Sequence, residues 1–129
     1  MEYLEKIDYL HFSHIALKRT QRLIVINQDL ADTYKGGYRV CNVSVGGRLC
    51  PPYVNVYRLI NEWLYFHKNH TPLENHIKFE LIHPFVDGNG RTGRMLMWWQ
   101  EIKEGNEPTL FKADERQEYY KLFDHPTKE

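Results

Sequence analysis

A twelve-residue segment at positions 83–94, HPFVDGNGRTGR, concentrates residue types that bind and transfer phosphate groups. Residues 88–90, Gly-Asn-Gly, form a glycine-rich turn that leads into a predicted helix. Such a turn presents several backbone N–H groups beside the positive end of the helix dipole, and this arrangement binds anions. Arg91 and Arg94 are three residues apart, so both guanidinium groups project from one face of that helix. The pattern indicates a site for more than one phosphate group.

Two further side chains of the segment have the chemistry to hold a metal ion and to accept a proton. The simplest use of Asp87 inside a positive site is to hold Mg²⁺, because magnesium in proteins binds one or two carboxylates together with phosphates and water. The imidazole of His83 has a pKa suited to taking a proton from a hydroxyl group near neutral pH. Phe85 is apolar in a polar segment, and we expect it to anchor the loop in the core. The combination indicates transfer of a phosphorus centre from a nucleotide to an alcohol.

Each of these features also has a simpler interpretation. A Gly-Asn-Gly sequence is usually only a turn. A histidine before proline is often capped or solvated, and two arginines one helical turn apart often lie on a solvated face. The order of the residues within one loop-to-helix junction favours the functional interpretation, because this junction supplies phosphate-binding groups, a metal ligand and a proton acceptor together.

Two other kinds of site fit the sequence less well. His76, Glu80 and His83 recur at i, i+4 and i+7 with Asp87 nearby, which suggests a metal hydrolase, but this spacing matches no common zinc signature. That interpretation also leaves the glycines and arginines without a role. A Walker-type phosphate loop does not fit, because no Gly-Lys-Ser/Thr sequence follows the glycines.

The segment is expected to connect two helices. Residues 71–74, Thr-Pro-Leu-Glu, predict a sharp helix start, in which threonine caps, proline takes the first position and glutamate completes a capping box. This helix should end near His83, because Pro84 disfavours helical geometry in the residue before it. The next helix is predicted from about Gly90 to Glu104, followed by Gly105 as a C-cap. The predicted inward side chains are Ile77, Phe79, Leu81 and Ile82 in the first helix and Met95, Trp98, Trp99 and Ile102 in the second.

Upstream of these helices the sequence predicts a β-hairpin. Side chains alternate from Val40 to Val45, Gly46-Gly47 offers a two-residue turn, and residues 48–50 form the second strand before Pro51-Pro52. Because a single strand pair is marginal alone, the hairpin must lie on helices.

Further helices are predicted over about residues 2–18, from the two prolines to about His67, and after Asp114, whereas residues 19–35 show no clear pattern. The side chains at helical spacing are Tyr3, Ile7, Leu10, His14 and Leu17, then Tyr53, Val56, Tyr57, Ile60, Trp63 and Leu64, and finally Tyr119, Leu122 and Phe123.

Length and composition are typical of a single globular domain. The 129 residues are 42% hydrophobic and 26% charged, and they show no repeats, low-complexity stretch or linker. Lys+Arg and Asp+Glu number 17 each, so no overall charge marks the chain as a binder of nucleic acid or membrane. No signal peptide or membrane-spanning run is present. Cys41 and Cys50 are not expected to face each other in the hairpin, so we expect a reduced, cytoplasmic protein.

The segment closely resembles the signature of the Fic-domain family, H-x-F-x-[DE]-G-N-G-R-x-x-R. The resemblance extends to Tyr38-Arg39 after glycine, to the hairpin that ends in Pro51-Pro52, to His76 on the preceding helix and to the sequence after the motif helix. It covers about residues 36–123, and the predicted N-terminal helix extends it. Every fixed position of the signature is filled, by His83, Phe85, Asp87, Gly88, Asn89, Gly90, Arg91 and Arg94.

This resemblance implies a mainly α, Fic-type helical bundle whose hairpin is a flap beside the active-site loop. It also implies a protein adenylyltransferase, which transfers AMP from ATP–Mg²⁺ to a Ser, Thr or Tyr hydroxyl of a target protein and releases pyrophosphate. His83 would be the general base and Asp87 would hold Mg²⁺. Residues 88–90 with Arg91 would bind the α and β phosphates, and Arg94 the γ phosphate. The flap would pair with the target as an added strand, clamped by Val43 and Val45.

The sequence departs from many family members in one respect. These carry a helix motif, [ST]-x-x-x-E-[GN], whose glutamate pairs with the last arginine of the signature and blocks the γ-phosphate position. The nearest match here, residues 13–18, has Leu17 in place of the glutamate. Three interpretations stay open: the enzyme acts without restraint, a separate antitoxin-like protein supplies the glutamate, or the chain is a fragment.

The transferred group is a further expectation. Some relatives of the family transfer a phosphate, UMP or phosphocholine, and those that phosphorylate have an altered loop. The unaltered Gly-Asn-Gly-Arg sequence at 88–91 favours AMP. The alternative to an enzyme is a Fic-fold module that binds nucleotide or protein without transfer, but binding alone does not need His83. The reaction would take place in the cytoplasm of the protein's own cell or, after delivery, of a host cell.

Overall fold

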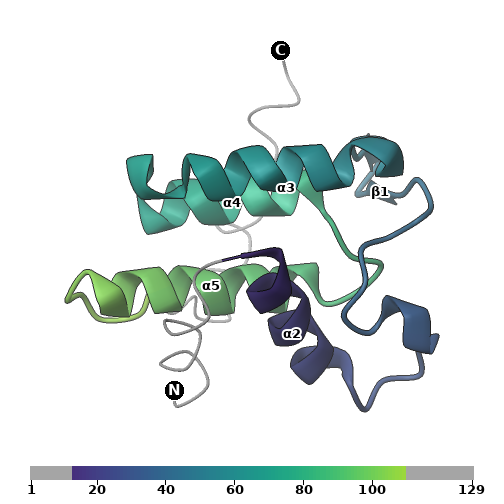
Figure 1. Ribbon diagram of the computed structural model, residues 1–129, viewed down its shortest axis with the longest axis horizontal. Coiled ribbons are helices and arrows are strands. Elements are labelled where there is room, and N and C mark those ends of the chain that lie inside the picture. Colours follow the sequence, from purple (N-terminus) through teal and green to yellow (C-terminus); the bar gives the residue numbers. More distant parts are fainter. Residues whose placement is uncertain (1–12, 110–129) are drawn as a thin grey trace.

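Four α-helices and one two-stranded hairpin make up residues 13–109, the part of the chain that the computed structural model describes (Figure 1). The predicted mainly α fold with one hairpin is confirmed. The helices are α2 (His14–Val25), α3 (Val56–Tyr65), α4 (Pro72–Ile82) and α5 (Asn89–Lys103), and the strands are β1 (Ser44–Val45) and β2 (Arg48–Leu49). Short 3₁₀ turns cover Asp32–Tyr34, Tyr53–Asn55 and His67–Asn69.

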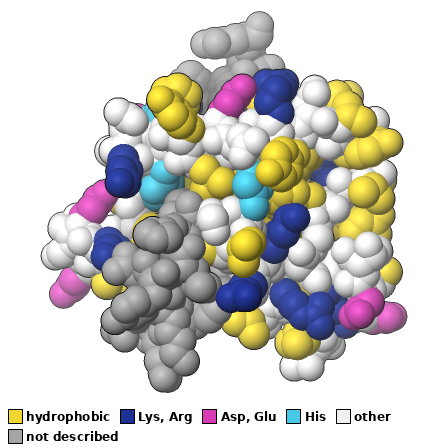
Figure 2. All heavy atoms as spheres, viewed as in Figure 1, with side chains coloured by type: hydrophobic (Ala, Val, Ile, Leu, Met, Phe, Trp, Pro, Cys, Tyr) yellow, Lys and Arg dark blue, Asp and Glu magenta, His cyan; other side chains and the backbone are white. Residues whose placement is uncertain are grey.

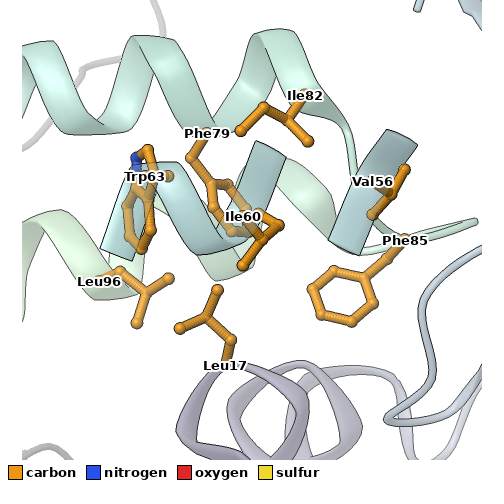
Figure 3. Packing of buried hydrophobic residues seen from close by; sticks show 8 residues of the cluster. All are labelled: Leu17, Val56, Ile60, Trp63, Phe79, Ile82, Phe85 and Leu96. Atoms are coloured by element: carbon orange, nitrogen blue, oxygen red, sulfur yellow. The ribbon is translucent and has the colours of Figure 1, made fainter. Parts of the chain in front are cut away.

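The helices pack in two layers around a shared core. Helix α4 packs against both α3 and α5, and α2 packs against α5; Figure 1 shows α3 and α4 in one layer and α2 and α5 in the other. Figure 3 shows that α2, α3, α4, α5 and the loop after α4 all contribute side chains to one apolar cluster. Its buried members are Leu17, Val56, Ile60, Trp63, Phe79, Ile82, Phe85 and Leu96. No helix within residues 13–109 is both long and apolar enough to cross a membrane.

Helix α4 begins and ends as its sequence predicts. The Thr71 hydroxyl accepts the Glu74 N–H at 3.2 Å, and the Glu74 carboxylate accepts the Thr71 N–H at 2.8 Å, so the capping box is complete. At the other end His83 is the C-cap in a left-handed conformation, with φ 52° and ψ 61°. Because Pro84 follows, the chain cannot continue as a helix and turns sharply at His83.

The predicted core stripe of α5 is wrong. Leu96, Met97 and Gln100 are buried, whereas Ile102 is 40% exposed; Met95, Trp98 and Trp99 are half-buried. The contact face is set by Gly93, where a Cβ atom would lie 3.0 Å from Nδ1 of His76. This close approach to α4 turns the face that contains Gly93, Leu96 and Gln100 inward.

The end predicted for the N-terminal helix near Lys18 is also wrong. Helix α2 starts at its cap, Ser13, and continues to Val25. Its inward face includes Thr20 and Gln21, both fully buried. Thr20 donates its hydroxyl to the carbonyl of Ala16 at 2.8 Å, so burial of this face depends on hydrogen bonds that an apolar pattern does not reveal. The predicted residues 2–12 of this helix, and the helix predicted after Asp114, lie outside the described residues.

The hairpin is shorter than predicted but has the predicted turn. Ser44 pairs with Leu49 and Val45 with Arg48, and both Gly46 and Gly47 have positive φ angles, as a tight hairpin turn requires. The carbonyl of Val43 accepts the N–H of Cys50 at 3.0 Å. Cys50 therefore faces Val43 rather than Cys41, and both thiols are free, as the sequence predicts.

The third helix differs from its prediction at both ends. Tyr53 lies in a 3₁₀ turn, and α3 ends at Tyr65. Tyr53 and Tyr57, predicted to face inward, are 40% and 57% exposed. Figure 2 shows hydrophobic side chains gathered along the edge of the molecule where the hairpin lies. The exposed apolar residues in and around the hairpin are Val40, Val45, Leu49, Tyr53, Val54 and Tyr57.

Candidate active site

Seven of the eight signature residues line one cavity of about 300 Å³ between the end of α4 and the start of α5. The structure thus brings together the residues that the sequence nominates for binding phosphate, metal and a proton. Phe85 lies apart from them, in the core. The lining consists of His83, Asp87, Gly88, Asn89, Gly90, Arg91 and Arg94, together with Glu80 and Val86.

His83 is held by its backbone at the rim of this cavity. Its carbonyl accepts the Nε–H of Arg39 at 2.7 Å, and the Pro84 carbonyl accepts the Arg39 backbone N–H at 2.9 Å. A left-handed conformation is strained for histidine, so the surrounding contacts must maintain it. These contacts hold the backbone, and the side chain of His83 lines the cavity.

The imidazole of His83 is neutral at physiological pH. Burial, together with the positive charges of Arg39 and Arg48, lowers its pKa to about 4. The carbonyl of Glu80 accepts a hydrogen bond from the ring and acts in the opposite direction. One ring nitrogen is thus the donor, and the other keeps a lone pair that can accept a proton.

The loop between His83 and α5 is closed by Phe85 and Asn89. The Asn89 side chain accepts the Phe85 N–H at 2.9 Å and donates to the Phe85 carbonyl at 2.8 Å. Phe85 is fully buried against Tyr38, with ring centroids 5.3 Å apart, as expected for an anchor. The Asn89 side chain is used to close the loop. The group of Asn89 that remains for an anion is its backbone N–H, at the first turn of α5.

Asp87 and Arg91 lie at the open side of the cavity. Their side chains are 55% and 46% exposed, and Arg91 Nη2 is 3.9 Å from Asp87 Oδ1. Asp87 Oδ1 also accepts the Gly88 N–H at 2.8 Å. A single carboxylate that faces solvent beside a phosphate site suits Mg²⁺, which completes its shell with phosphate oxygens and water.

Glu80 is a site residue that the phosphate interpretation did not include. Burial raises its pKa to about 7, although the positive charges of Arg94 and Arg48 act against this shift. Arg94 Nη1 and Glu80 Oε2 lie 3.4 Å and 3.8 Å from the same point, the position of a Cβ atom on Gly90. Arg94 is half-buried and lines the cavity together with Glu80.

Sequence analysis also missed the role of Arg39, which fixes the hairpin to the site. Arg39 is 1% exposed, and its guanidinium donates to four carbonyl groups, those of Cys41, Pro51, Ile82 and His83. These acceptors flank the hairpin on both sides and end α4. A single arginine gives no spacing pattern, and only the resemblance around Tyr38-Arg39 could have drawn attention to it.

The hairpin residues nominated for target docking lie outside the cavity lining. Val43 is half-buried and Val45 is 42% exposed. Arg48, in the hairpin, has a positive charge that acts to lower the pKa of both His83 and Glu80.

The metal-hydrolase alternative has no site in the part of the chain that the structure describes. No group of three or more His, Cys, Asp or Glu side chains within residues 13–109 could hold a metal ion. His76 is 1% exposed, and burial lowers its pKa to about 4. Leu17, at the position of the missing inhibitory glutamate, is fully buried in the apolar cluster (Figure 3).

Comparisons with known proteins agree with this geometry. The model of the Fic/DOC family matches residues 16–100. A protein adenylyltransferase Fic of Aedes aegypti is 35% identical over 99 residues, which cover 69% of this chain and 20% of that protein. One of Drosophila mojavensis is 28% identical and covers 86% of this chain and 26% of that protein. The solved structure of Fic-1 from C. elegans aligns with a TM-score of 0.69 at 25% identity over 92% of this chain and 38% of that one. The chain thus spans about a fifth to a quarter of the curated relatives it matches.

Proposed function

Because the chain belongs to the Fic/DOC family, we propose that it is a protein adenylyltransferase, which transfers AMP from ATP to a hydroxyl group of a target protein. The observation that carries this proposal is the single cavity lined by seven signature residues. The names of the relatives, protein adenylyltransferase Fic, support the same reaction.

His83 is the general base in the proposed reaction. Its neutral imidazole takes the proton of a target hydroxyl as that oxygen attacks the α phosphorus of ATP. A new O–P bond forms, the bond between the α phosphorus and the bridging oxygen breaks, and pyrophosphate leaves with its electron pair. A pKa of about 4 keeps the imidazole neutral at pH 7, but it also makes His83 a weaker base than the ordinary histidine that the sequence led us to expect.

The phosphate chain is bound along the first turns of α5. The backbone N–H groups that follow Gly88, together with Arg91, take the α and β phosphates. Arg94, one helical turn further, takes the γ phosphate. Asp87 would hold Mg²⁺, which neutralises phosphate charge and that of the leaving group.

The hydroxyl group, from serine, threonine or tyrosine, reaches His83 on an extended segment of the target. Within the described residues β1 pairs with β2 only, so its second edge is open to another strand. Strand addition at an open edge uses main-chain hydrogen bonds and leaves the side chains to select the partner. Val43 and Val45 would clamp that segment.

Inhibition of the enzyme and its location in the cell are two further parts of the proposal. Leu17 is an apolar core side chain, so a separate inhibitory protein would have to bring its own glutamate to Arg94. The free thiols of Cys41 and Cys50 support a reducing cytoplasm, that of the protein's own cell or of a host cell.

The test uses purified protein, cell lysate and Mg²⁺, labelled in parallel with α-³²P-ATP and γ-³²P-ATP. The control is His83→Asn, because asparagine tolerates the left-handed backbone but cannot act as a base. We expect His83-dependent label on a protein from the α phosphate alone. Label from the γ phosphate alone would replace AMP transfer by phosphate transfer, and ATP binding without label from either would favour a binding module.

A further inference from the structure

Gln28, which lies outside the signature, contacts both charged groups at the open side of the cavity. It follows α2 in a turn, where its backbone N–H donates to the Val25 carbonyl at 2.9 Å. Its position relative to α2 is therefore fixed. The side chain is half-buried and extends toward the loop before α5.

The amide of Gln28 bridges Asp87 and Arg91. With its nitrogen toward the carboxylate, it donates to Asp87 Oδ2 at 2.6 Å. Its oxygen then accepts from Nη1 and Nη2 of Arg91 at 2.7 Å and 2.6 Å. This is the orientation that satisfies both partners, because a carboxylate only accepts hydrogen bonds and a guanidinium only donates them.

The bridge adds a restraint to two half-exposed side chains, of which Asp87 also accepts the Gly88 N–H. Asp87 and Arg91 are about half exposed, and their direct contact is 3.9 Å, longer than a hydrogen bond. Holding such side chains in place before a ligand arrives lowers the conformational entropy lost on binding. An amide has no net charge, so the carboxylate keeps its charge for a cation and the guanidinium keeps its charge for a phosphate.

A second glutamine, which lies within α2, holds the backbone of this loop. Gln21 donates from Nε2 to the carbonyls of Asp87 at 3.1 Å and Tyr34 at 3.0 Å, and it accepts the Gly36 N–H at 2.6 Å. Gln21 is fully buried, so its contacts are part of the fold. Gln28 differs, because its partners are the side chains assigned to metal and phosphate.

We propose that Gln28 is a positioning residue, which sets the Asp87 carboxylate and the Arg91 guanidinium in the orientation that receives ATP–Mg²⁺. This inference rests on the proposed function and deepens it. Each carboxylate oxygen carries two lone pairs, so Asp87 can accept from Gln28 and still bind a cation.

The test compares Gln28→Met, which keeps the length of the side chain but removes the bridge, with Asn27→Ala, a change at the exposed neighbouring amide. Binding of ATP is measured by calorimetry over a series of Mg²⁺ concentrations, and Tm is measured for each variant. Loss of a residue that orients a metal ligand typically weakens binding ten- to a hundredfold. We expect a weakening in that range for Gln28→Met, together with a higher Mg²⁺ requirement and an unchanged Tm, and no change for Asn27→Ala.

Three results would overturn the inference alone. Two of them are ATP binding by Gln28→Met within twofold of that of the parental chain, and ATP binding that is tighter than that of the parental chain. Tighter binding would show that the amide occupies the place of the ligand. A lower Tm with an unchanged Mg²⁺ requirement would assign Gln28 to the fold instead. Absence of ATP–Mg²⁺ binding by the parental chain would overturn the proposed function and this inference with it.

Discussion

Gly88 joins the signature loop to α5, and replacing it with alanine should destabilise the whole domain. Its φ angle is +78°, a left-handed conformation that costs an L-residue roughly 1–2 kcal/mol. A Cβ atom there would lie only 2.7 Å from Cγ1 of Val25 in α2, which is too close for any real contact. Overpacking of this kind costs about 1–3 kcal/mol. The two effects together predict a loss of about 2–5 kcal/mol in the free energy of unfolding.

The assay is urea and thermal unfolding of Gly88→Ala beside Gly105→Ala. Gly105 has a similar φ angle of +83°, but nothing lies within 4 Å of its Cβ position, so alanine there incurs only the backbone strain. At about 4 °C per kcal/mol for a domain of this size, Gly88→Ala should lower Tm by about 8–20 °C and Gly105→Ala by about 4–8 °C.

A double-mutant cycle with Val25→Ala isolates the steric part of the effect. Shortening Val25 removes the atom that the new methyl group would strike, so the double variant should be more stable than the sum of the single changes by about 1–3 kcal/mol. Equal losses at Gly88 and Gly105, or an additive cycle, would refute the claim that contact with α2 determines the cost.

Three further outcomes follow from the site and the core. Arg94→Ala should weaken ATP binding more than ADP binding, and equal weakening would remove the γ-phosphate assignment. Arg39→Met should lower the free energy of unfolding by about 3–5 kcal/mol, because four buried carbonyl groups lose their donor; a denaturant titration measures this. Burial lowers the pKa of His76 to about 4 in the folded state, below the value of 6.5 in the unfolded state. The contribution of His76 to the free energy of unfolding is therefore complete above pH 6.5 and is lost as the pH falls toward 4. Between pH 7 and pH 5 this histidine alone should lower the free energy of unfolding by about 2 kcal/mol, and His76→Asn should flatten that part of the curve.

The elements that sequence reasoning predicted are those whose signals are local. Thr71 and Glu74 cap α4 within one turn, and Gly46-Gly47 forms the hairpin turn without help from other elements. The signature also lies within a single loop-to-helix junction, so its residues had to meet in space.

The elements that it missed depend on contacts between distant parts of the chain. The part of helix α2 after Lys18 escaped detection because Thr20 and Gln21 occupy its buried face, where apolar side chains would have revealed it. The inward face of α5 was misassigned because Gly93, which carries no side chain, decides how closely α5 approaches α4. No local pattern encodes either effect, since each depends on a partner that the fold supplies.

The signature contains the residues to which we assign roles in the reaction, whereas residues outside the signature hold their backbone in place. Arg39 fixes the end of α4 through the carbonyl of His83, and Gln21 fixes the backbone of Asp87. Neither residue belongs to the signature, and both are buried donors whose acceptors are main-chain carbonyls. Removing such a donor leaves buried carbonyls unsatisfied, so the first effect of the substitution should be a lower stability of the fold. We therefore expect that loss of Arg39 or Gln21 would disturb the cavity even in a chain whose signature is intact.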